Sequence, residues 1–121
     1  MTNQPEHSPV KRFCKTLTLK DDSELISEYK RVHAADAVWP EVGKGMREVG
    51  ILDMEIYIHG NRLFMIMETV PDFDHDKAMK ELAGKPRQDE WEAYVSRFQQ
   101  ASKDASADDK WQIMERIYKL D

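Results

Sequence analysis

The chain has 121 residues, and its 18 basic and 23 acidic side chains give a formal net charge of −5. This length suits one domain and is too short for two independent hydrophobic cores. The acidic balance argues against nucleic acid as a partner, and the longest apolar run, residues 63–67, is far shorter than the ~20 residues that span a bilayer. The only cysteine, Cys14, cannot form an intramolecular disulfide, which fits a reducing compartment. We therefore expect a cytoplasmic protein without nucleic-acid or membrane partners.

The first part of the chain predicts a strand followed by two helices. Residues 1–10 are expected to be a loose tail, and residues 11–20 alternate apolar and polar side chains, which favours a strand. Residues 21–23 offer N-caps for a helix whose apolar face is formed by Leu25, Ile26, Tyr29, Val32 and His33. Pro40 suits the first turn of a second helix that reaches about residue 49 and ends at Gly50.

The middle of the chain predicts a hairpin and two further helices. Residues 51–58 and 63–70 are β-rich runs separated by a Gly-Asn pair, which is typical of a tight hairpin. Residues 72–83 predict a short helix. Residues 87–101 predict a longer one, whose apolar stripe is formed by Trp91, Tyr94, Val95 and Phe98.

The end of the chain completes a recognisable order of elements. A polar loop is expected over residues 103–110 and a last strand over residues 111–120. The order β-α-(α)-β-β-α-α-β is that of a ferredoxin-like α+β domain over residues 11–121, with an antiparallel sheet and helices on one face. The other face of the sheet needs a cover, so we expect a homodimer.

Most sites with a sequence signature are absent. No phosphate-binding loop, dinucleotide fingerprint or local pair of metal ligands occurs, although histidines that are distant in sequence could still converge on a metal. Cys14 lies in a predicted strand, and we expect it to be a buried, inert thiol.

Tyr29 and His33 are the first candidates for chemistry. They are four residues apart and share one face of a predicted helix. Imidazole can give or take a proton near neutral pH, and a phenol one turn away can bind the same small polar ligand. The alternative is that both residues simply belong to an amphipathic helix.

Aromatic and acidic side chains offer a second set of candidates. Indole rings can pack against the apolar face of a sugar, although Trp111 in the last predicted strand is expected to be a core residue. Glu55 and Tyr57 share one face of their strand, and Met54 lies with Ile56 on the other. The acidic face could line a polar cavity or could be solvated.

Five motifs follow one another along the chain: Tyr29-x-x-x-His33, WPEV at residues 39–42, GILDMEIYIHGNRLFMIME at residues 50–68, EWEAY at residues 90–94 and MERIYKL at residues 114–120. In this order and spacing they resemble the L-rhamnose mutarotase family, which also includes L-fucose mutarotases. The resemblance covers about residues 11–120.

The resemblance implies a ferredoxin-like domain that dimerises into an α+β barrel. It also implies a cofactor-free isomerase that interconverts the α and β anomers of a small monosaccharide, a 6-deoxy-L-hexose. By position, His33 corresponds to the family's proton donor, Tyr29 to a sugar-binding residue and Trp91 to the first aromatic residue of a sugar-binding pair. Trp39 in the Trp-Pro motif is a further substrate-binding candidate.

Three departures from the family's pattern concern the sugar contacts. Residues 34–38 place two more residues than usual between the histidine and the Trp-Pro pair. Glu92 stands where the family has the second aromatic residue, and Met54 where it has a tyrosine. Both positions stay substrate-binding candidates, and the departures favour L-fucose over L-rhamnose.

Opening the pyranose ring requires a proton on the ring oxygen and the loss of one from the anomeric hydroxyl. We expect His33 to handle one proton and Tyr29 to orient the sugar, with Glu55 as a candidate for the other proton. The competing hypothesis is a non-catalytic small-ligand-binding protein or an oxygenase-like dimeric α+β barrel, since a fold does not fix a function. Loss of His33 would then weaken binding without a separate effect on rate.

Overall fold

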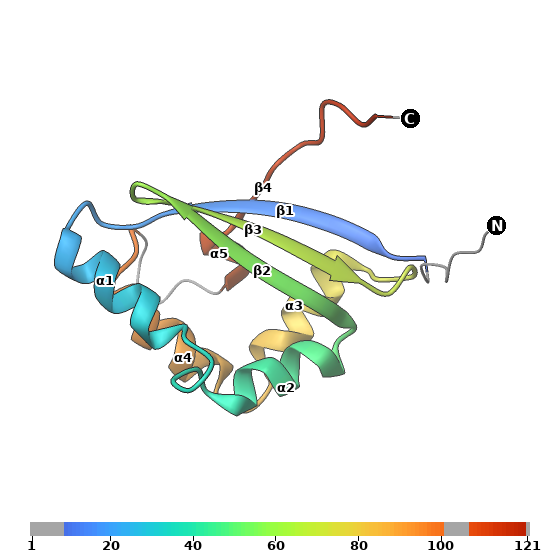
Figure 1. Cartoon of the computed structure of the whole chain (residues 1–121). Coiled ribbons are helices and arrows are strands. Elements are labelled where there is room, and N and C mark those ends of the chain that lie inside the picture. The colour runs from blue at the N-terminus through green and yellow to red at the C-terminus, as the bar shows by residue number, and fades with distance from the viewer. Residues whose placement is uncertain (1–8, 101–106, 121) are drawn as a thin grey trace.

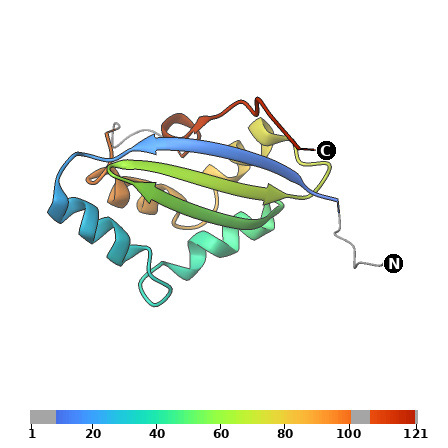
Figure 2. The same ribbon diagram turned by 45° about the horizontal axis from the view of Figure 1, so that its top comes forward.

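Four antiparallel strands form one sheet in the computed structural model of the chain, which describes residues 9–100 and 107–120. The sheet order is β2-β3-β1-β4, and its strands are β1 (Lys11–Thr18), β2 (Ile51–His59), β3 (Arg62–Thr69) and β4 (Gln112–Ile113). The helices are α1 (Ser23–Val32), α2 (Pro40–Glu48), α3 (His75–Ala83), α4 (Gln88–Ser96) and α5 (Ala107–Lys110). The helices lie on one side of the sheet (Figures 1 and 2). This arrangement confirms the predicted ferredoxin-like α+β fold; most of the expected N-terminal tail lies outside the described residues.

The two faces of the sheet differ because side chains alternate along each strand. The face toward the helices carries a core of buried aliphatic and methionine side chains from the central strands, namely Leu17, Leu63, Met65 and Met67, with Leu19 just beyond β1. We call the opposite side, which no helix covers, the open face. It carries Cys14, which is half-buried rather than fully buried as expected.

A β-bulge sets the direction of the side chains along β2. Ile51 pairs with Thr69 and Asp53 with Glu68, so Leu52 is an extra residue in the strand. The bulge shifts the alternation, which lets both Ile51 and Met54 point toward the helices. The predicted placement of Glu55 and Tyr57 on one face of this strand and of Met54 on the other is confirmed.

The beginnings of the helices follow their capping residues. The Asp22 side chain accepts hydrogen bonds from the backbone N–H groups of Glu24 (2.9 Å) and Leu25 (3.1 Å), and Pro40 opens α2 as predicted. α3 begins at His75 instead of residue 72. Its cap is Asp74, whose carboxylate accepts from the Lys77 N–H at 3.3 Å.

The fourth helix is shorter than predicted because its C-terminal residues pair with the end of β1. The expected helix over residues 87–101 ends at Ser96. The Lys20 N–H donates to the Phe98 carbonyl at 2.9 Å, and the Gln100 N–H donates to the Thr18 carbonyl at 3.0 Å. These bonds tie the chain after α4 to the sheet, so it leaves the helical path.

The predicted strand over residues 111–120 is largely wrong. Only Gln112 and Ile113 pair with β1, and the last bond to this strand runs from the Met114 N–H to the Cys14 carbonyl at 2.7 Å. Residues 115–120 then leave the sheet, and Ile117 is 91% exposed (Figure 1). At this edge of the sheet the alternating apolar side chains do not pack into the core. The preceding loop, predicted over residues 103–110, contains the short helix α5, and residues 101–106 lie outside the described chain.

Among the residues that the structure describes, no helix is long and apolar enough to cross a membrane.

Candidate active site

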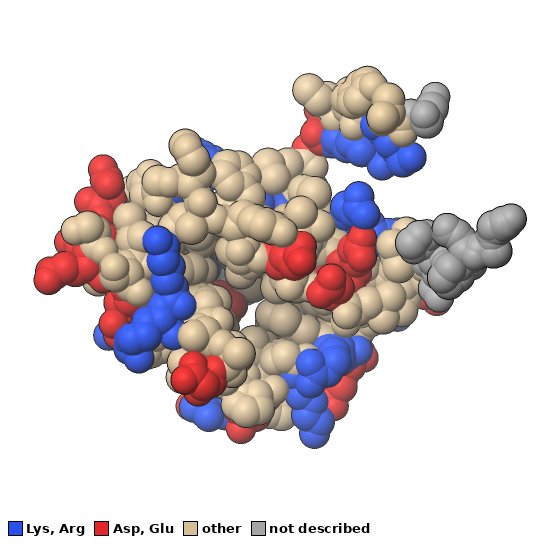
Figure 3. All heavy atoms as spheres, viewed as in Figure 1, with Lys and Arg blue, Asp and Glu red and all other residues tan. Residues whose placement is uncertain are grey.

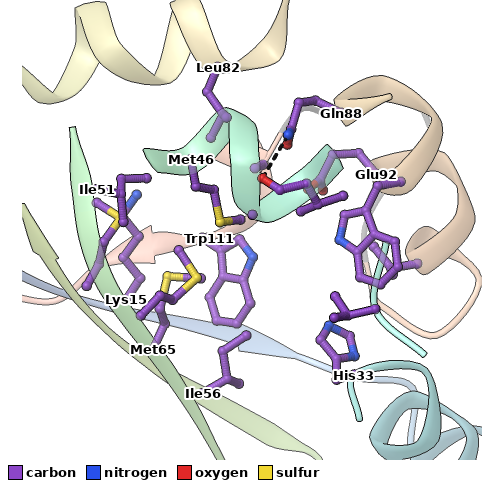
Figure 4. A pocket seen from close by; sticks show the side chains of 18 of the residues that line it. Lys15, His33, Met46, Ile51, Ile56, Met65, Leu82, Gln88, Glu92 and Trp111 are labelled. Carbon is purple, nitrogen blue, oxygen red and sulfur yellow. Dashed lines mark hydrogen bonds between the residues drawn. The ribbon is translucent and has the colours of Figure 1, made fainter. Parts of the chain in front are cut away.

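A cavity of about 240 Å³ lies between the sheet and the helices that cover it. The space-filling view shows the molecule hollowed at this place, between β2 and the helices (Figure 3). Most of the wall is apolar and includes five methionines: Met46, Met54, Met65, Met67 and Met79. Among these apolar groups stand a few polar side chains, a combination typical of small-molecule sites. They include Lys15, His33, Gln88 and Glu92 (Figure 4).

His33 lines this cavity at the C-terminal end of α1. Its Nδ1 atom lies 2.8 Å from the main-chain carbonyl oxygen of Tyr29. A carbonyl can only accept, so Nδ1 carries the hydrogen and Nε2 is left with its lone pair. Burial lowers the pKa of His33, although the bond to Tyr29 opposes this effect. At neutral pH the cavity therefore contains an uncharged imidazole that can accept a proton at Nε2.

Tyr29 packs directly against this imidazole. The two ring centroids are 4.1 Å apart, as expected for residues one helical turn from each other, and Tyr29 is only 4% exposed. Burial raises the pKa of the Tyr29 phenol, so its hydroxyl keeps its proton. It can donate a hydrogen bond to a ligand oxygen beside His33.

Trp91 forms part of the cavity wall next to His33, and Trp39 packs against Trp91 outside the cavity. The Trp91 ring lies edge-on to the imidazole at a centroid distance of 5.3 Å and lines the cavity. Trp39 meets Trp91 at 5.2 Å and stacks on Tyr94 at 5.5 Å, while the guanidinium of Arg87 lies 4.0 Å from the Trp39 ring. Trp39 is not part of the cavity wall, so the geometry gives it a positioning role.

Met54 and Glu92, the two positions that depart from the family's aromatic residues, both line the cavity. Glu92 is held by Lys110, whose Nζ donates to Oε1 at 2.9 Å and to the Glu92 main-chain oxygen at 2.7 Å. The Lys110 side chain is completely buried. This partner compensates the negative charge of Glu92 and fixes its position in the wall.

Glu55 is the one candidate that the structure separates from the others. It lies on the open face, where it accepts a hydrogen bond from the Tyr57 hydroxyl at 3.1 Å. It shares a shallow concavity with Arg12, Cys14 and Glu68. The sheet stands between Glu55 and His33, so these two side chains cannot act on one sugar in the same subunit.

Residues 34–38, where two extra residues were inferred, form a compact turn. The N–H groups of Ala37 and Val38 both donate to the Ala34 carbonyl, at 2.9 and 3.0 Å. The turn brings Val38 into the cavity wall.

Sequence reasoning missed several cavity residues as candidates, among them Gln88, Lys15, Gln99 and Trp111. Lys15 is 1% exposed. Its sequence signal is a charged side chain at a position of β1 where the alternation predicts an apolar one. Gln99 is also 1% exposed, and its Oε1 atom has no hydrogen-bond partner in the described part of the chain. The position of Gln99 depends on how the chain runs after α4, and no local sequence pattern predicts that path. Trp111 is buried as expected for a core residue, but it also lines the cavity.

Within residues 9–100 and 107–120, no three histidine, cysteine, aspartate or glutamate side chains come together as a metal site.

Comparisons with known proteins show to which family the chain belongs. The family model described as L-rhamnose mutarotase matches residues 12–120. The chain is 39% identical over 111 residues to an L-fucose mutarotase of Xanthomonas campestris pv. campestris, covering 92% of this chain and 89% of that protein. It is 34% identical over 115 residues to a UPF0734 protein of Dictyostelium discoideum, covering 92% of this chain and 90% of that protein.

A solved structure shows the same fold. The crystal structure of an L-rhamnose mutarotase from Formosa agariphila superimposes with a TM-score of 0.68 at 18% identity, over 92% of this chain and 99% of that one. The match of the family model over nearly the whole chain, together with the 39% identical relative, settles the family. The chain belongs to the L-rhamnose mutarotase family.

Proposed function

We propose that this protein is a mutarotase that interconverts the α and β anomers of a 6-deoxy-L-hexose pyranose. The observation that carries the proposal is the state of His33, an uncharged imidazole whose Nδ1–H is bonded to Tyr29 and whose Nε2 is available in the cavity. Ring opening of a hemiacetal needs such a proton carrier and no nucleophile.

His33 acts first as a base in this scheme. Nε2 takes the proton of the anomeric hydroxyl and passes it to the ring oxygen as the bond between C1 and that oxygen breaks, which leaves the imidazole neutral beside the open-chain aldehyde. The aldehyde turns about the bond between C1 and C2. As the ring closes, the C5 hydroxyl oxygen attacks C1, Nε2 takes the proton of that hydroxyl, and the imidazolium delivers it to the former carbonyl oxygen. His33 is therefore both proton acceptor and proton donor in each half of the cycle. A general acid–base contribution of this kind accelerates a reaction by about 10²–10⁴-fold.

L-Fucose is the substrate we favour. The relative from Xanthomonas campestris carries the name L-fucose mutarotase and covers 92% of this chain. Met54 and Glu92 give the cavity wall one apolar and one charged group at the two positions where the family has aromatic side chains. These contacts act on the sugar hydroxyls and leave the chemistry of His33 unchanged.

The test is proton NMR saturation transfer between the anomeric signals of L-fucose and of L-rhamnose, with catalytic amounts of protein. We expect fast exchange for L-fucose, and loss of the acceleration in His33→Asn. His59→Asn is the matched control, because His59 is an exposed histidine at the end of β2. Wild-type protein that binds L-fucose but leaves its anomer exchange at the uncatalysed rate would favour the non-catalytic binding protein instead, and full acceleration by His33→Asn would refute the role of His33.

We also propose that the enzyme is a cytoplasmic homodimer whose subunits meet through their open faces. The open face carries the half-buried side chains of Phe64 and Ile66 and the 55% exposed Tyr57. It also carries both signs of charge, with Arg12 and Glu68 paired at 2.8 Å. Such a face can be complementary to a second copy of itself about a two-fold axis.

Sedimentation velocity tests the dimer. We expect the wild-type chain to sediment with twice its 14.2 kDa mass at micromolar concentration, and Ile66→Asp to sediment as a folded monomer. A wild-type protein that stays monomeric at this concentration would refute this part of the proposal.

A further inference from the structure

Lys15 is a buried cation in the cavity wall. It lies on β1, a central strand of the sheet, and is 1% exposed. Among the side chains that the structure describes, none forms a hydrogen bond or an ion pair with its ammonium group. The close view shows Lys15 and His33 on different sides of the cavity, with Lys15 directed toward Ile51 (Figure 4).

The surroundings of Lys15 offer its ammonium group no direct contact that compensates its charge. The neighbouring wall consists of Ile51, Met65 and other apolar side chains. Burial lowers the pKa of Lys15, and the carboxylates of Asp108 and Asp76 act against this shift without forming an ion pair with it. An ammonium group removed from water without hydrogen-bond acceptors destabilises the fold, which proteins rarely tolerate outside a functional site.

The other buried lysine of the cavity region shows what a structural role looks like. Lys110 is equally buried, but its Nζ is bonded to two oxygens of Glu92, at 2.7 and 2.9 Å. Lys15 has no such acceptors in the described chain, yet it lines the same cavity. The acceptors it lacks are the groups that a sugar supplies, because each hydroxyl oxygen has lone pairs for an N–H donor.

We propose that Lys15 is a substrate-binding residue whose ammonium donates hydrogen bonds to pyranose hydroxyls away from the anomeric centre that His33 serves. This inference rests on the mutarotase function proposed above. Lys15 and His33 would then hold the sugar from two sides, so that the anomeric hydroxyl meets Nε2 of the imidazole.

The Lys15→Met variant separates binding from both folding and chemistry. Methionine keeps the length and apolar character of the stem and removes the charge. A hydrogen bond from a charged donor contributes enough that its loss should raise KM for L-fucose roughly 10-fold to 100-fold. We expect kcat to stay within about 3-fold of wild type, because the groups at the anomeric centre are unchanged. The melting temperature should rise, because an unpaired buried charge is gone.

Lys44→Met is the matched control, since Lys44 is exposed on α2, and we expect it to leave KM unchanged. If Lys15→Met fails to fold, Lys15→Gln replaces it and should raise KM by a smaller factor. An unchanged KM in a folded Lys15 variant, or a fall in melting temperature with an unchanged KM, would overturn the proposal.

The two proposals fail in different ways. If the wild-type protein exchanges neither sugar but binds L-fucose in a saturation-transfer-difference experiment, the mutarotase function fails, and the binding constants of wild type and Lys15→Met still test Lys15. If the wild-type protein neither exchanges nor binds these sugars, both proposals fall. If it is active and Lys15→Met has the wild-type KM, only the inference about Lys15 falls.

Discussion

His33 Nδ1 lies 2.8 Å from the carbonyl oxygen of Tyr29, one helical turn earlier in the chain. This bond closes the C-terminal end of α1 and at the same time selects the tautomer of the imidazole. Because Nδ1 is occupied, only Nε2 is available for chemistry. The same local contact therefore serves the helix and the proposed reaction.

The pH dependence of activity should report the buried imidazole. Burial lowers the pKa of His33 below the ordinary value of about 6.5. The reactive neutral form then persists at pH 6.5, and kcat/KM should decline only at lower pH. A pH profile of anomer exchange, corrected for the acid-catalysed background, measures this decline. An acid limb centred above pH 7 would contradict the assignment.

The same group links folding stability to pH. The unfolded chain binds a proton at His33 at higher pH than the folded chain does, so stability is lost as pH falls from about 6.5 through the lower pKa of the folded state. Above that window the contribution is constant. Urea denaturation of wild type and His33→Asn at pH 7.5 and 5.5 tests this, and the variant should lose less stability between the two. His59→Asn should behave as wild type; equal losses in wild type and His33→Asn would disprove the linkage.

Gly45 allows α2 to approach α4 closely. A Cβ atom at this position would lie 2.7 Å from Nε2 of Gln88, which donates to the Val42 carbonyl at 3.0 Å. We expect Gly45→Ala to destabilise the fold by about 1–3 kcal/mol. Gly43→Ala is the control, because its Cβ would meet only the guanidinium of Arg47, at 3.3 Å. Thermal unfolding should separate the two variants, and the idea fails if Gly45→Ala is as stable as wild type.

The ion pair between Lys110 and Glu92 should be a structural requirement of the cavity wall. Lys110→Met leaves the Glu92 carboxylate without its partner in a mostly buried place. Breaking such a pair from one side destabilises a protein by roughly 3 kcal/mol, whereas replacing both partners is far less harmful. A double-mutant cycle with Lys110→Met and Glu92→Gln, read by chemical denaturation, should give a clear coupling energy. Additive effects of the two substitutions would show that the pair contributes nothing.

Local patterns predicted most of the fold, and tertiary contacts explain the errors. The Asp22 cap, the Pro40 helix start and the Gly-Asn hairpin depend on a few neighbouring residues, and all three are found as predicted. The end of α4 depends on pairing with β1, far away in sequence. The predicted last strand had the right alternation, but only two of its residues reach a partner strand.

The candidate site was likewise predicted where its residues are close in sequence and missed where distant segments meet. Tyr29 and His33 share a helix face, so their spacing alone brought them together. Glu55 was assigned to the correct face of its strand relative to Met54, but the sequence does not say which face the helices cover. Lys15 is a charged residue in an alternating strand, and its role depends on the cavity that several helices and strands distant in sequence build around it.

The most direct measurement is anomer exchange of L-fucose by NMR saturation transfer with wild-type protein and His33→Asn under identical conditions. The mutarotase proposal predicts rapid exchange with wild type and exchange at the uncatalysed rate with His33→Asn. Wild-type protein that leaves the spontaneous rate of both L-fucose and L-rhamnose unchanged would contradict it.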